Sequence, residues 1–378
     1  MNFDLNEEQS AFQQMAANFS KDELEPCAAE WDENSYFPLE VMRRGAALGL
    51  AGLYVSPKYG GAGLGRLDGT IIFEELSKGC TSTAAFLTIH NMVARLIEQN
   101  GSEGIKDRFL SKLCSMELVA SYCLTEPGSG SDAASLTTKA ERTRDGYVLN
   151  GTKAFISGGG VSDVYVVMVR TGESGASGIS CVLVEKGTPG LSFGANERKM
   201  GWKSQPTAQV VFEDCHIPLA NLVGQEGQGF KIAMQGLDGG RLNIGACSLG
   251  AAEACLSQSL QYMQERKQFG KTLSQFQALQ FKLADMTTEL EAARLLLRKA
   301  ASLVDRKDAS ATKMVAMAKL LATDTGFKVV NDALQLHGGY GYLKDYPLER
   351  YLRDVRVHQI LEGTNEVMRL IIARELLK

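Results

Sequence analysis

One glutamate near the end of the chain has a setting that suits proton transfer. Glu362 stands between leucine and glycine in the segment 361–366, LEGTNE, a few residues after Arg353, Arg356 and His358. A carboxylate in an apolar pocket is a stronger base than one in water, because desolvation disfavours its charged form. The pattern therefore predicts a general base at this position. A solvated glutamate at the start of a helix is the alternative that this pattern leaves open.

A second segment combines small residues with hydroxyl groups. It reads YCLTEPGSGSD over residues 122–132. Glycine and serine let a backbone approach a flat ligand closely, and hydroxyl and free N–H groups can bind carbonyl and phosphate oxygens. The segment is a candidate ligand loop, with an ordinary surface turn as the alternative.

Three shorter segments carry weaker signals. Phe155-Ile156-Ser157 sets an aromatic ring beside a hydroxyl, which could cover a planar ring and bind its edge, although an ordinary strand explains it as well. The segments RKQFG at 266–270 and QLHGGYG at 335–341 each follow a helical pattern. Their glycines are typical of helix ends and of close approach to a ligand.

Missing motifs argue against several other kinds of site. The segment GAGLGR at 61–66 has arginine in its sixth position and follows a proline-broken stretch, so it is a poor dinucleotide-binding fingerprint. The sequence has no GxxxxGK[ST] phosphate loop, no GxSxG nucleophile elbow and no HExxH zinc motif. Its eight cysteines form no CxxC pair, so we expect reduced thiols in the core and no metal site.

Composition indicates a globular enzyme of two or three domains. The chain has 378 residues, a mass of 41.0 kDa, 44% hydrophobic residues and a formal net charge of -4. An acidic chain lacks the basic face that nucleic acid or anionic lipid requires. No run approaches the roughly 18 apolar residues of a membrane span. The start, MNFDLNEEQS, resembles neither a secretory signal nor an arginine-rich presequence, although a matured mitochondrial protein would have lost one.

Helical spacing dominates the first and last parts of the chain. In the first part it begins at a cap-like Asn6 and covers residues 37–55 and 70–98. After about residue 226, apolar residues recur at steps of three and four, and a further helix is predicted over 314–336. These longer helices are expected to form a four-helix bundle.

Between these helical parts lie signals for strands. Short runs rich in Val and Ile, such as 164–169 and 179–184, are separated by Gly, Ser and Pro and predict an antiparallel β unit of sandwich or barrel type. Blocks of helices, strands and helices indicate an α+β fold rather than an alternating parallel sheet. We predict an N-terminal helical domain at 1–116, a middle β domain at 117–225 and a C-terminal four-helix bundle domain at 226–378.

Together these segments resemble the acyl-CoA dehydrogenase family, flavoproteins that oxidise acyl-CoA thioesters to 2-enoyl-CoA. The matching motifs are YCLTEPGSGSD, NGTKAFIS, RKQFG, QLHGGYGYLKDYPLERYLRD and QILEGTNEV, which occur in the family's order and span nearly the whole chain. The family's architecture agrees with the three domains expected from the pattern. The stretches AEWDENSYFPLEVMR and GCTSTAAFLTIHNM are most similar to the valine-pathway branch of the family.

The resemblance implies an FAD cofactor between the β domain and the bundle. Ser157 would lie near the N5 edge of the flavin. Arg266 and Phe269 would meet the FAD of a neighbouring subunit, Arg266 at the pyrophosphate, where a guanidinium suits phosphate geometry. The implied cofactor-binding residues are Tyr122, Leu124, Thr125, Gly130, Ser131, Phe155, Ile156, Ser157, Arg266, Phe269, Phe276, Gln277, Gln335, Leu336, His337, Gly338, Gly339, Thr364 and Glu366.

The resemblance also bears on the catalytic base. Family members place it either in the last loop, here Glu362, or within 237–241, where Gly240 occupies the carboxylate position and cannot accept a proton. Glu362 is therefore the predicted catalytic residue. Contacts with the acyl-CoA substrate are implied for Ser131, Asp238, Arg241, Gly363 and Arg374.

The implied reaction is FAD-dependent α,β-dehydrogenation of a short branched acyl-CoA, isobutyryl-CoA to methacrylyl-CoA in valine degradation. Leu361, where many straight-chain relatives carry tyrosine, would admit the branch. Butyryl-CoA or 2-methylbutyryl-CoA as substrate, an oxidase and a non-catalytic flavoprotein are the alternatives. Electrons would pass to electron transfer flavoprotein. The usual assembly of the family implies a homotetramer, a dimer of dimers in which FAD is shared between subunits. The implied location is the mitochondrial matrix of a eukaryote or the cytoplasm of a bacterium.

Overall fold

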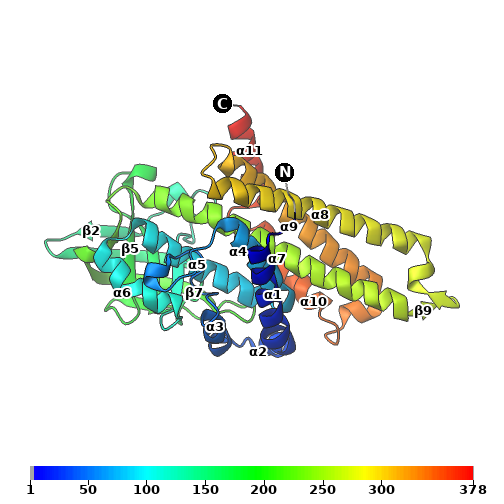
Figure 1. The fold of residues 1–378 in the computed structure, drawn as a ribbon. Coiled ribbons are helices and arrows are strands. Elements are labelled where there is room, and N and C mark those ends of the chain that lie inside the picture. The colour runs from blue at the N-terminus through cyan, green and yellow to red at the C-terminus, as the bar shows by residue number, and fades with distance from the viewer. Residues whose placement is uncertain (1–3, 378) are drawn as a thin grey trace.

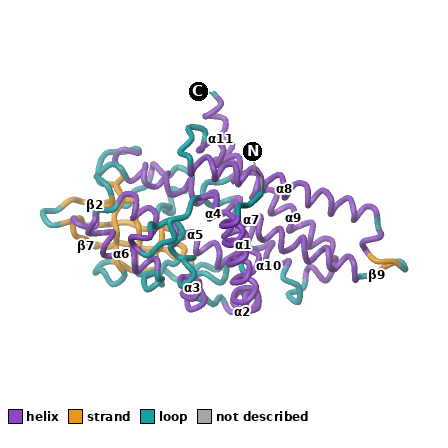
Figure 2. Tube along the Cα trace, in the orientation of Figure 1, coloured by secondary structure: helices purple, strands orange, loops and turns teal. Residues whose placement is uncertain are grey.

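The strands and the long helices lie at opposite ends of an elongated molecule. The structure, a computed structural model, describes residues 4–377. Its strands gather at one end, and the long helices α7 (Gly229–Glu265), α8 (Gln277–Asp305) and α9 (Ala311–His337) extend to the other (Figures 1 and 2). The order of helices, sheet and helices confirms the predicted fold class.

The predicted start of the first helix is confirmed. α1 (Glu7–Phe19) begins after Asn6, whose side chain accepts a hydrogen bond from the Gln9 N–H at 2.8 Å, while the Gln9 side chain accepts from the Asn6 N–H. This reciprocal pair satisfies two N–H groups that a helix start leaves free. The helical pattern over 70–98 is also confirmed, as two helices separated at Cys80. The helices that follow α1 in this domain are α2 (Ala28–Asn34), α3 (Leu39–Ala46), α4 (Arg66–Gly79), α5 (Thr81–Asn100) and α6 (Glu103–Cys114).

The helix predicted over 37–55 is wrong in its second half. α3 ends at Ala46, and turns follow. Asn91 of α5 holds these turns, because its side chain accepts from the Leu53 N–H at 2.8 Å and donates to the Leu50 carbonyl at 2.8 Å. These bonds come from a distant helix, so local apolar spacing could not reveal the turns.

The middle segment forms one mixed sheet. Among the described residues it has eight strands, with the path β6-β7-β3-β2-β4-β5-β8 and with β1 paired to β4. Most neighbours are antiparallel as expected, but the pairs β1–β4 and β2–β4 are parallel. Local turn signals report hairpins only, so they could not predict these pairings between distant segments. The strands are β1 (Ala120–Cys123), β2 (Lys139–Arg142), β3 (Gly146–Ser157), β4 (Val164–Arg170), β5 (Ile179–Glu185), β6 (Leu191–Phe193), β7 (Thr207–Pro218) and β8 (Leu222–Val223).

The last part of the chain is helical, as predicted. The predicted helix over 314–336 lies within α9, and Leu290 and Leu297 of α8 are buried at the expected helical spacing. A small hairpin of β9 (Lys267–Gln268) and β10 (Lys271–Thr272) joins α7 to α8. The chain ends with α10 (Leu348–Arg356) and α11 (Asn365–Leu376).

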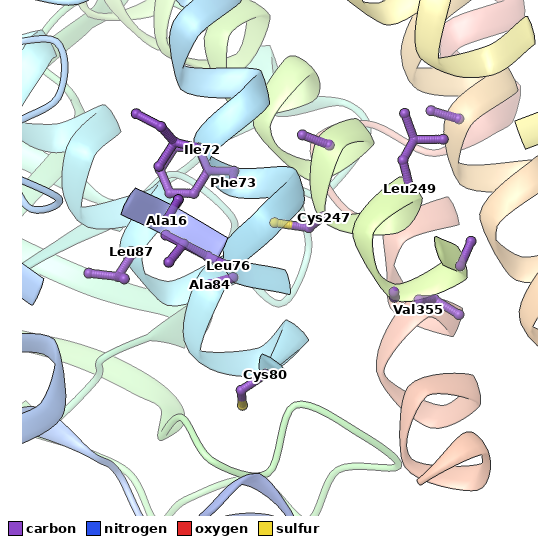
Figure 3. Packing of buried hydrophobic residues seen from close by; sticks show 14 of the residues in the cluster. Ala16, Ile72, Phe73, Leu76, Cys80, Ala84, Leu87, Cys247, Leu249 and Val355 are labelled. Atoms are coloured by element: carbon purple, nitrogen blue, oxygen red, sulfur yellow. The ribbon is translucent and has the colours of Figure 1, made fainter. Parts of the chain in front are cut away.

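The main core joins the N-terminal helices to the bundle. Phe73 and Leu76 of α4 pack in one cluster with Cys247 and Leu249 of α7 and with Val355 of α10 (Figure 3). All eight cysteines are free and seven are buried, which confirms their assignment to the core. This core continues from one helical domain to the other, so it does not mark where one domain ends. The domain boundaries at 116/117 and 225/226 therefore stay predictions. Within residues 4–377, every helix is too short or too polar to cross a membrane.

Candidate active site

Glu362 lies in the loop between α10 and α11, where the backbone takes a rare conformation. The φ angles are 57° at Glu362 and 88° at Gly363. The left-handed conformation costs a residue other than glycine roughly 1–2 kcal/mol, so neighbouring groups must hold the loop. Thr364 then caps α11, because its side chain accepts a hydrogen bond from the Val367 N–H at 3.3 Å.

The Glu362 carboxylate lies against the backbone of α7. A β-carbon built on Gly240 would be 2.6 Å from Glu362 Oε2 and 2.7 Å from Oε1, so only glycine leaves room for the carboxylate. Oε2 is buried and has no hydrogen-bond partner among the described residues. This placement excludes the alternative of a solvated glutamate at a helix start.

Burial dominates the electrostatics of this carboxyl group. Burial raises the pKa of Glu362 to about 7, although the positive charges of Arg241 and Lys319 act in the opposite direction. Tyr122 of β1 shares this environment: burial, followed by the negative charge of Glu362, raises its pKa well above the ordinary value. A carboxyl group with a pKa near 7 can both accept and release a proton at neutral pH.

The hydrogen bond from Arg241 to Glu362 goes to the backbone and not to the carboxylate. Its Nε donates to the Glu362 carbonyl at 2.9 Å and its Nη1 binds Asp238 Oδ1 at 2.8 Å, with only 4% of the residue exposed. Of the other residues predicted to contact acyl-CoA, Asp238 is partly exposed and Ser131 and Arg374 are exposed. Their contacts with the substrate stay predictions.

A buried ion pair organises the segment 122–132. Lys153 is 0% exposed, and its Nζ lies 2.7 Å from Glu126 Oε1. The Glu126 carboxylate also accepts from the N–H groups of Thr137 at 2.6 Å and Thr138 at 2.9 Å. Burial opposes ionisation, but the Lys153 charge and these hydrogen bonds lower the pKa of Glu126 to about 2. The ion pair therefore joins the predicted flavin loop to β3.

The end of β3 brings the second predicted segment beside the first. The Ala154 N–H donates to the Thr125 carbonyl at 2.8 Å. Phe155 has a φ of 58° and is 68% exposed, whereas Ile156 is buried and Ser157 is half-buried. An exposed ring beside the hydroxyl-rich loop offers a surface on which a planar ligand can rest.

The remaining predicted cofactor residues lie elsewhere. Arg266 and the residues from Gln335 to Gly339 line one cavity of about 600 Å³, in which the His337 ring stacks on Tyr262 at 4.3 Å. Phe269, 93% exposed, is in the turn between β9 and β10. Its lining includes Gln268 of β9, and Figure 1 shows β9 at the end of the bundle opposite the sheet. Within one chain, the residues of each predicted cofactor group therefore lie together, but the two groups lie apart from each other.

A buried cation beside the loop, Lys319, is not among the residues predicted from the sequence. Lys319 of α9 is 0% exposed, and its Nζ donates to the Gly363 carbonyl at 2.9 Å. Its signal was a lone lysine inside the apolar run VAMAKLLA at 315–322. Within residues 4–377, we find no cluster of His, Cys, Asp and Glu that could hold a metal ion.

Family models cover nearly the whole chain. The N-terminal, middle and C-terminal domain models of acyl-CoA dehydrogenase match residues 6–117, 121–215 and 227–377. The chain belongs to the acyl-CoA dehydrogenase family. This acyl-CoA dehydrogenase is 60% identical over 375 residues to the mitochondrial isobutyryl-CoA dehydrogenase of Dictyostelium discoideum and 58% identical over 374 residues to that of Bos taurus. Each match covers 99% of this chain and 90% of the relative.

Solved structures share the fold of this acyl-CoA dehydrogenase. A chain from a structure described as the electron transferring flavoprotein of Acidaminococcus fermentans has a TM-score of 0.97 and 43% identity, with full coverage of both chains. Butyryl-CoA dehydrogenase from Megasphaera elsdenii has a TM-score of 0.97 and 39% identity, and each chain is covered to 100%. The FAD complex of PigA has a TM-score of 0.96 and 33% identity, covering 100% of this chain and 99% of that one.

Proposed function

We propose that this enzyme oxidises a short branched acyl-CoA, isobutyryl-CoA, to methacrylyl-CoA, with Glu362 as the base. The observation that carries the proposal is the buried carboxylate of Glu362, which lies unpaired against Gly240. The identity of 60% to an isobutyryl-CoA dehydrogenase supports the substrate. Butyryl-CoA and 2-methylbutyryl-CoA are the alternative substrates.

The residues present fit an FAD cofactor. A Cβ built on Gly128 or Gly130 would meet nothing within 4 Å, so this loop presents open backbone. The exposed Phe155 ring stands beside it, and Arg266 lines the separate cavity with a charge suited to a pyrophosphate. Solved relatives such as the FAD complex of PigA support the same cofactor.

Glu362 carries out the proton transfer. Its carboxylate accepts the proton that leaves the α-carbon of the thioester, while a hydride leaves the β-carbon and a carbon–carbon double bond forms. FAD, when bound, supplies the acceptor for that hydride. Arg241 keeps the carbonyl of Glu362 in place, and Oε2 of the carboxylate is buried. The residual proton on Glu362 is released to solvent as the product leaves.

The separation of the two groups of cofactor residues supports an oligomer. Phe155 belongs to β3 in the sheet, whereas Arg266 directly precedes β9, and Figure 1 shows β9 at the opposite end of the molecule from the sheet. A second copy would therefore supply the Arg266 group to each flavin. We propose a homotetramer built from two such dimers, with electron transfer flavoprotein as the redox partner. The mitochondrial matrix in a eukaryote, or the cytoplasm in a bacterium, is the proposed location.

Substrate choice is assigned to the residue before the base. Leu361 packs with Trp202, Ile244 and Ala85 in a small apolar cluster close to Glu362. A flexible leucine in place of a rigid ring leaves space for the methyl branch of isobutyryl-CoA. A difference of one methylene group is worth about 1–3 kcal/mol, so we expect a preference rather than exclusive use.

The test is a substrate panel with the purified yellow enzyme. We expect kcat/KM to be highest for isobutyryl-CoA among isobutyryl-, butyryl-, 2-methylbutyryl- and isovaleryl-CoA, with anaerobic bleaching of the flavin and little peroxide in air. A clear preference for butyryl-CoA would contradict the branched substrate. Strong peroxide production would indicate an oxidase, and absence of bleaching with every substrate would indicate a non-catalytic flavoprotein.

A second test addresses the shared cofactor site. We expect R266A to retain less FAD after gel filtration than the wild type, because the pyrophosphate would lose its charged partner. K299A removes an exposed lysine from α8 and serves as the control. Equal FAD retention in R266A and K299A would contradict the role proposed for Arg266.

A further inference from the structure

The ammonium group of Lys319 is enclosed by the loop that carries Glu362. Lys319 is 0% exposed, and its Nζ donates to the Gly363 carbonyl at 2.9 Å and to Asn365 Oδ1 at 2.8 Å. A lysine is seldom fully buried unless its charge is paired or hydrogen-bonded. Here both observed partners are neutral oxygens at the start of α11, so the contacts fix that backbone.

A side-chain network on α9 extends the same contact. The Asn365 amide group donates to Asp324 Oδ1 at 2.7 Å and to Thr323 Oγ1 at 2.9 Å. Gln359, on the other side of the loop, donates to the same Asp324 oxygen at 2.7 Å. The loop is therefore tied to α9 both before and after Glu362.

Two cations bind neighbouring peptide carbonyls of this loop. Arg241 of α7 binds the carbonyl of Glu362, and Lys319 of α9 binds the carbonyl of Gly363. Neither makes a hydrogen bond to Glu362 Oε2, which has no partner among the described residues. The two cations thus hold two adjacent residues with positive φ and leave the carboxylate free.

We propose that Lys319 is a positioning residue of the reaction: its ammonium group fixes the Gly363 peptide and thereby keeps the Glu362 carboxylate unpaired against Gly240. The inference rests on the proposed role of Glu362 as the base. It assigns to α9 a part in catalysis without direct contact with the substrate. A misplacement of about 1 Å in a catalytic group can cost about 100-fold in rate, so removal of this support should be visible in kcat.

The charge of Lys319 has a second effect on the same carboxyl group. Lys319 lowers the pKa of Glu362, and burial lowers the pKa of Lys319 itself to about 8. The other charged groups that face Lys319 are Arg241 on α7, Asp324 on α9 and Glu366 on α11. His358 lies close too, and burial followed by the Lys319 charge lowers its pKa to about 3. Loss of the Lys319 charge should therefore raise the pKa of Glu362.

The test compares K319Q and K319R with K328Q in the purified holoenzyme. Lys328 lies on the same helix but is exposed and pairs with Glu289, so K328Q controls for the substitution itself. In K319Q we expect kcat to fall at least about tenfold and the acid limb of the pH profile to move up by about one unit. K319R keeps the charge but changes the donor geometry, so kcat should fall while the limb stays. K328Q should match the wild type in both.

Hydrogen exchange of the peptide that spans 357–368 gives a readout independent of turnover. We expect faster exchange in K319Q and K319R than in K328Q, because the loop loses its anchor on α9. Wild-type kcat and wild-type exchange in K319R would overturn the inference, even if K319Q fails to fold. Inactive E362Q together with fully active K319Q would overturn only the inference. Active E362Q would overturn the proposed base itself.

Discussion

The carboxylate of Glu362 lies against the α-carbon of Gly240, at the place where a side chain on α7 would project. A Cβ at Gly240 would be 2.6 Å from Oε2, closer than nonbonded atoms can approach. The absence of a side chain at one position is therefore a condition for the buried acid at the other. A base can come from the loop only because α7 offers a gap there.

Alanine at position 240 should separate activity from stability. G240A would force the Glu362 carboxylate away from α7, so we expect kcat to fall by about 100-fold. Glycine inside a helix costs about 1 kcal/mol relative to alanine, so the melting temperature should fall little, if at all. Steady-state kinetics and thermal melting of the same preparation check both.

A matched glycine distinguishes the clash from helix propensity. Gly104 lies in α6, and a Cβ there would meet nothing within 4 Å. G104A should raise the free energy of unfolding slightly and leave kcat unchanged. Equal kcat in G240A and G104A would contradict the steric relationship between Gly240 and Glu362.

The pH profile of the wild type should reflect the buried base. Burial raises the pKa of Glu362 to about 7, and only the deprotonated form accepts a proton. We therefore expect kcat/KM to fall as the pH drops below about 7. Burial also raises the pKa of Asp354 to about 6, so D354N is the control. A limb that disappears in D354N would assign the profile to Asp354 instead.

The same carboxyl group should make stability depend on pH. The folded pKa of about 7 exceeds the ordinary glutamate value of 4.5, so the folded state binds a proton more tightly than the unfolded state. This contribution is fully present below pH 4.5 and is lost as the pH rises through 7, a change of about 3 kcal/mol. E362Q cannot titrate, so its melting temperature should exceed the wild-type value more at pH 8 than at pH 5.5.

A surface glutamate provides the comparison for this prediction. Glu213 of β7 is exposed, so the pH dependence of melting in E213Q should follow that of the wild type. A constant difference in melting temperature between E362Q and the wild type from pH 5.5 to 8 would contradict a raised pKa at Glu362. Melting should be followed in the same buffers for all three proteins.

Breaking the buried pair of Lys153 and Glu126 should disturb the flavin loop. K153M leaves the Glu126 carboxylate buried without its cation, which typically costs about 3–5 kcal/mol. We expect a lower melting temperature and reduced FAD content. The double variant E126Q/K153M removes both charges and should recover part of the stability. A double variant no better than K153M alone would contradict the coupling between the two charges.

The sequence predicted the helices and strands better than the tertiary contacts between them. The helical spacing around Leu290 and the strand signals from 164 to 184 depend on neighbours in the chain, and both were confirmed. The parallel pairing of β1 with β4 and the contact of Asn91 with the turns after α3 join distant segments. Spacing and propensity contain no information on such contacts, so the structure was needed to find them.

The same distinction applies to the site. Family motifs placed the candidate base at Glu362. They also indicated that the alternative position is Gly240, which cannot accept a proton. Neither motif nor spacing revealed that this glycine gives the carboxylate its space, or that Lys319 supports the loop from α9. These relationships depend on the packing of three helices and one loop, which local patterns do not describe.

Arg266 lines a cavity that includes no residue of the Glu362 loop, and this arrangement has a genetic consequence. If each flavin takes its base from one chain and its arginine from another, two defective alleles can compensate for each other. Co-expression of E362Q and R266A chains would yield mixed pairs with one doubly damaged centre and one intact centre. Partial recovery of turnover in such hybrids, absent from a blend of the separately purified homomers, would reveal complementation across the subunit boundary.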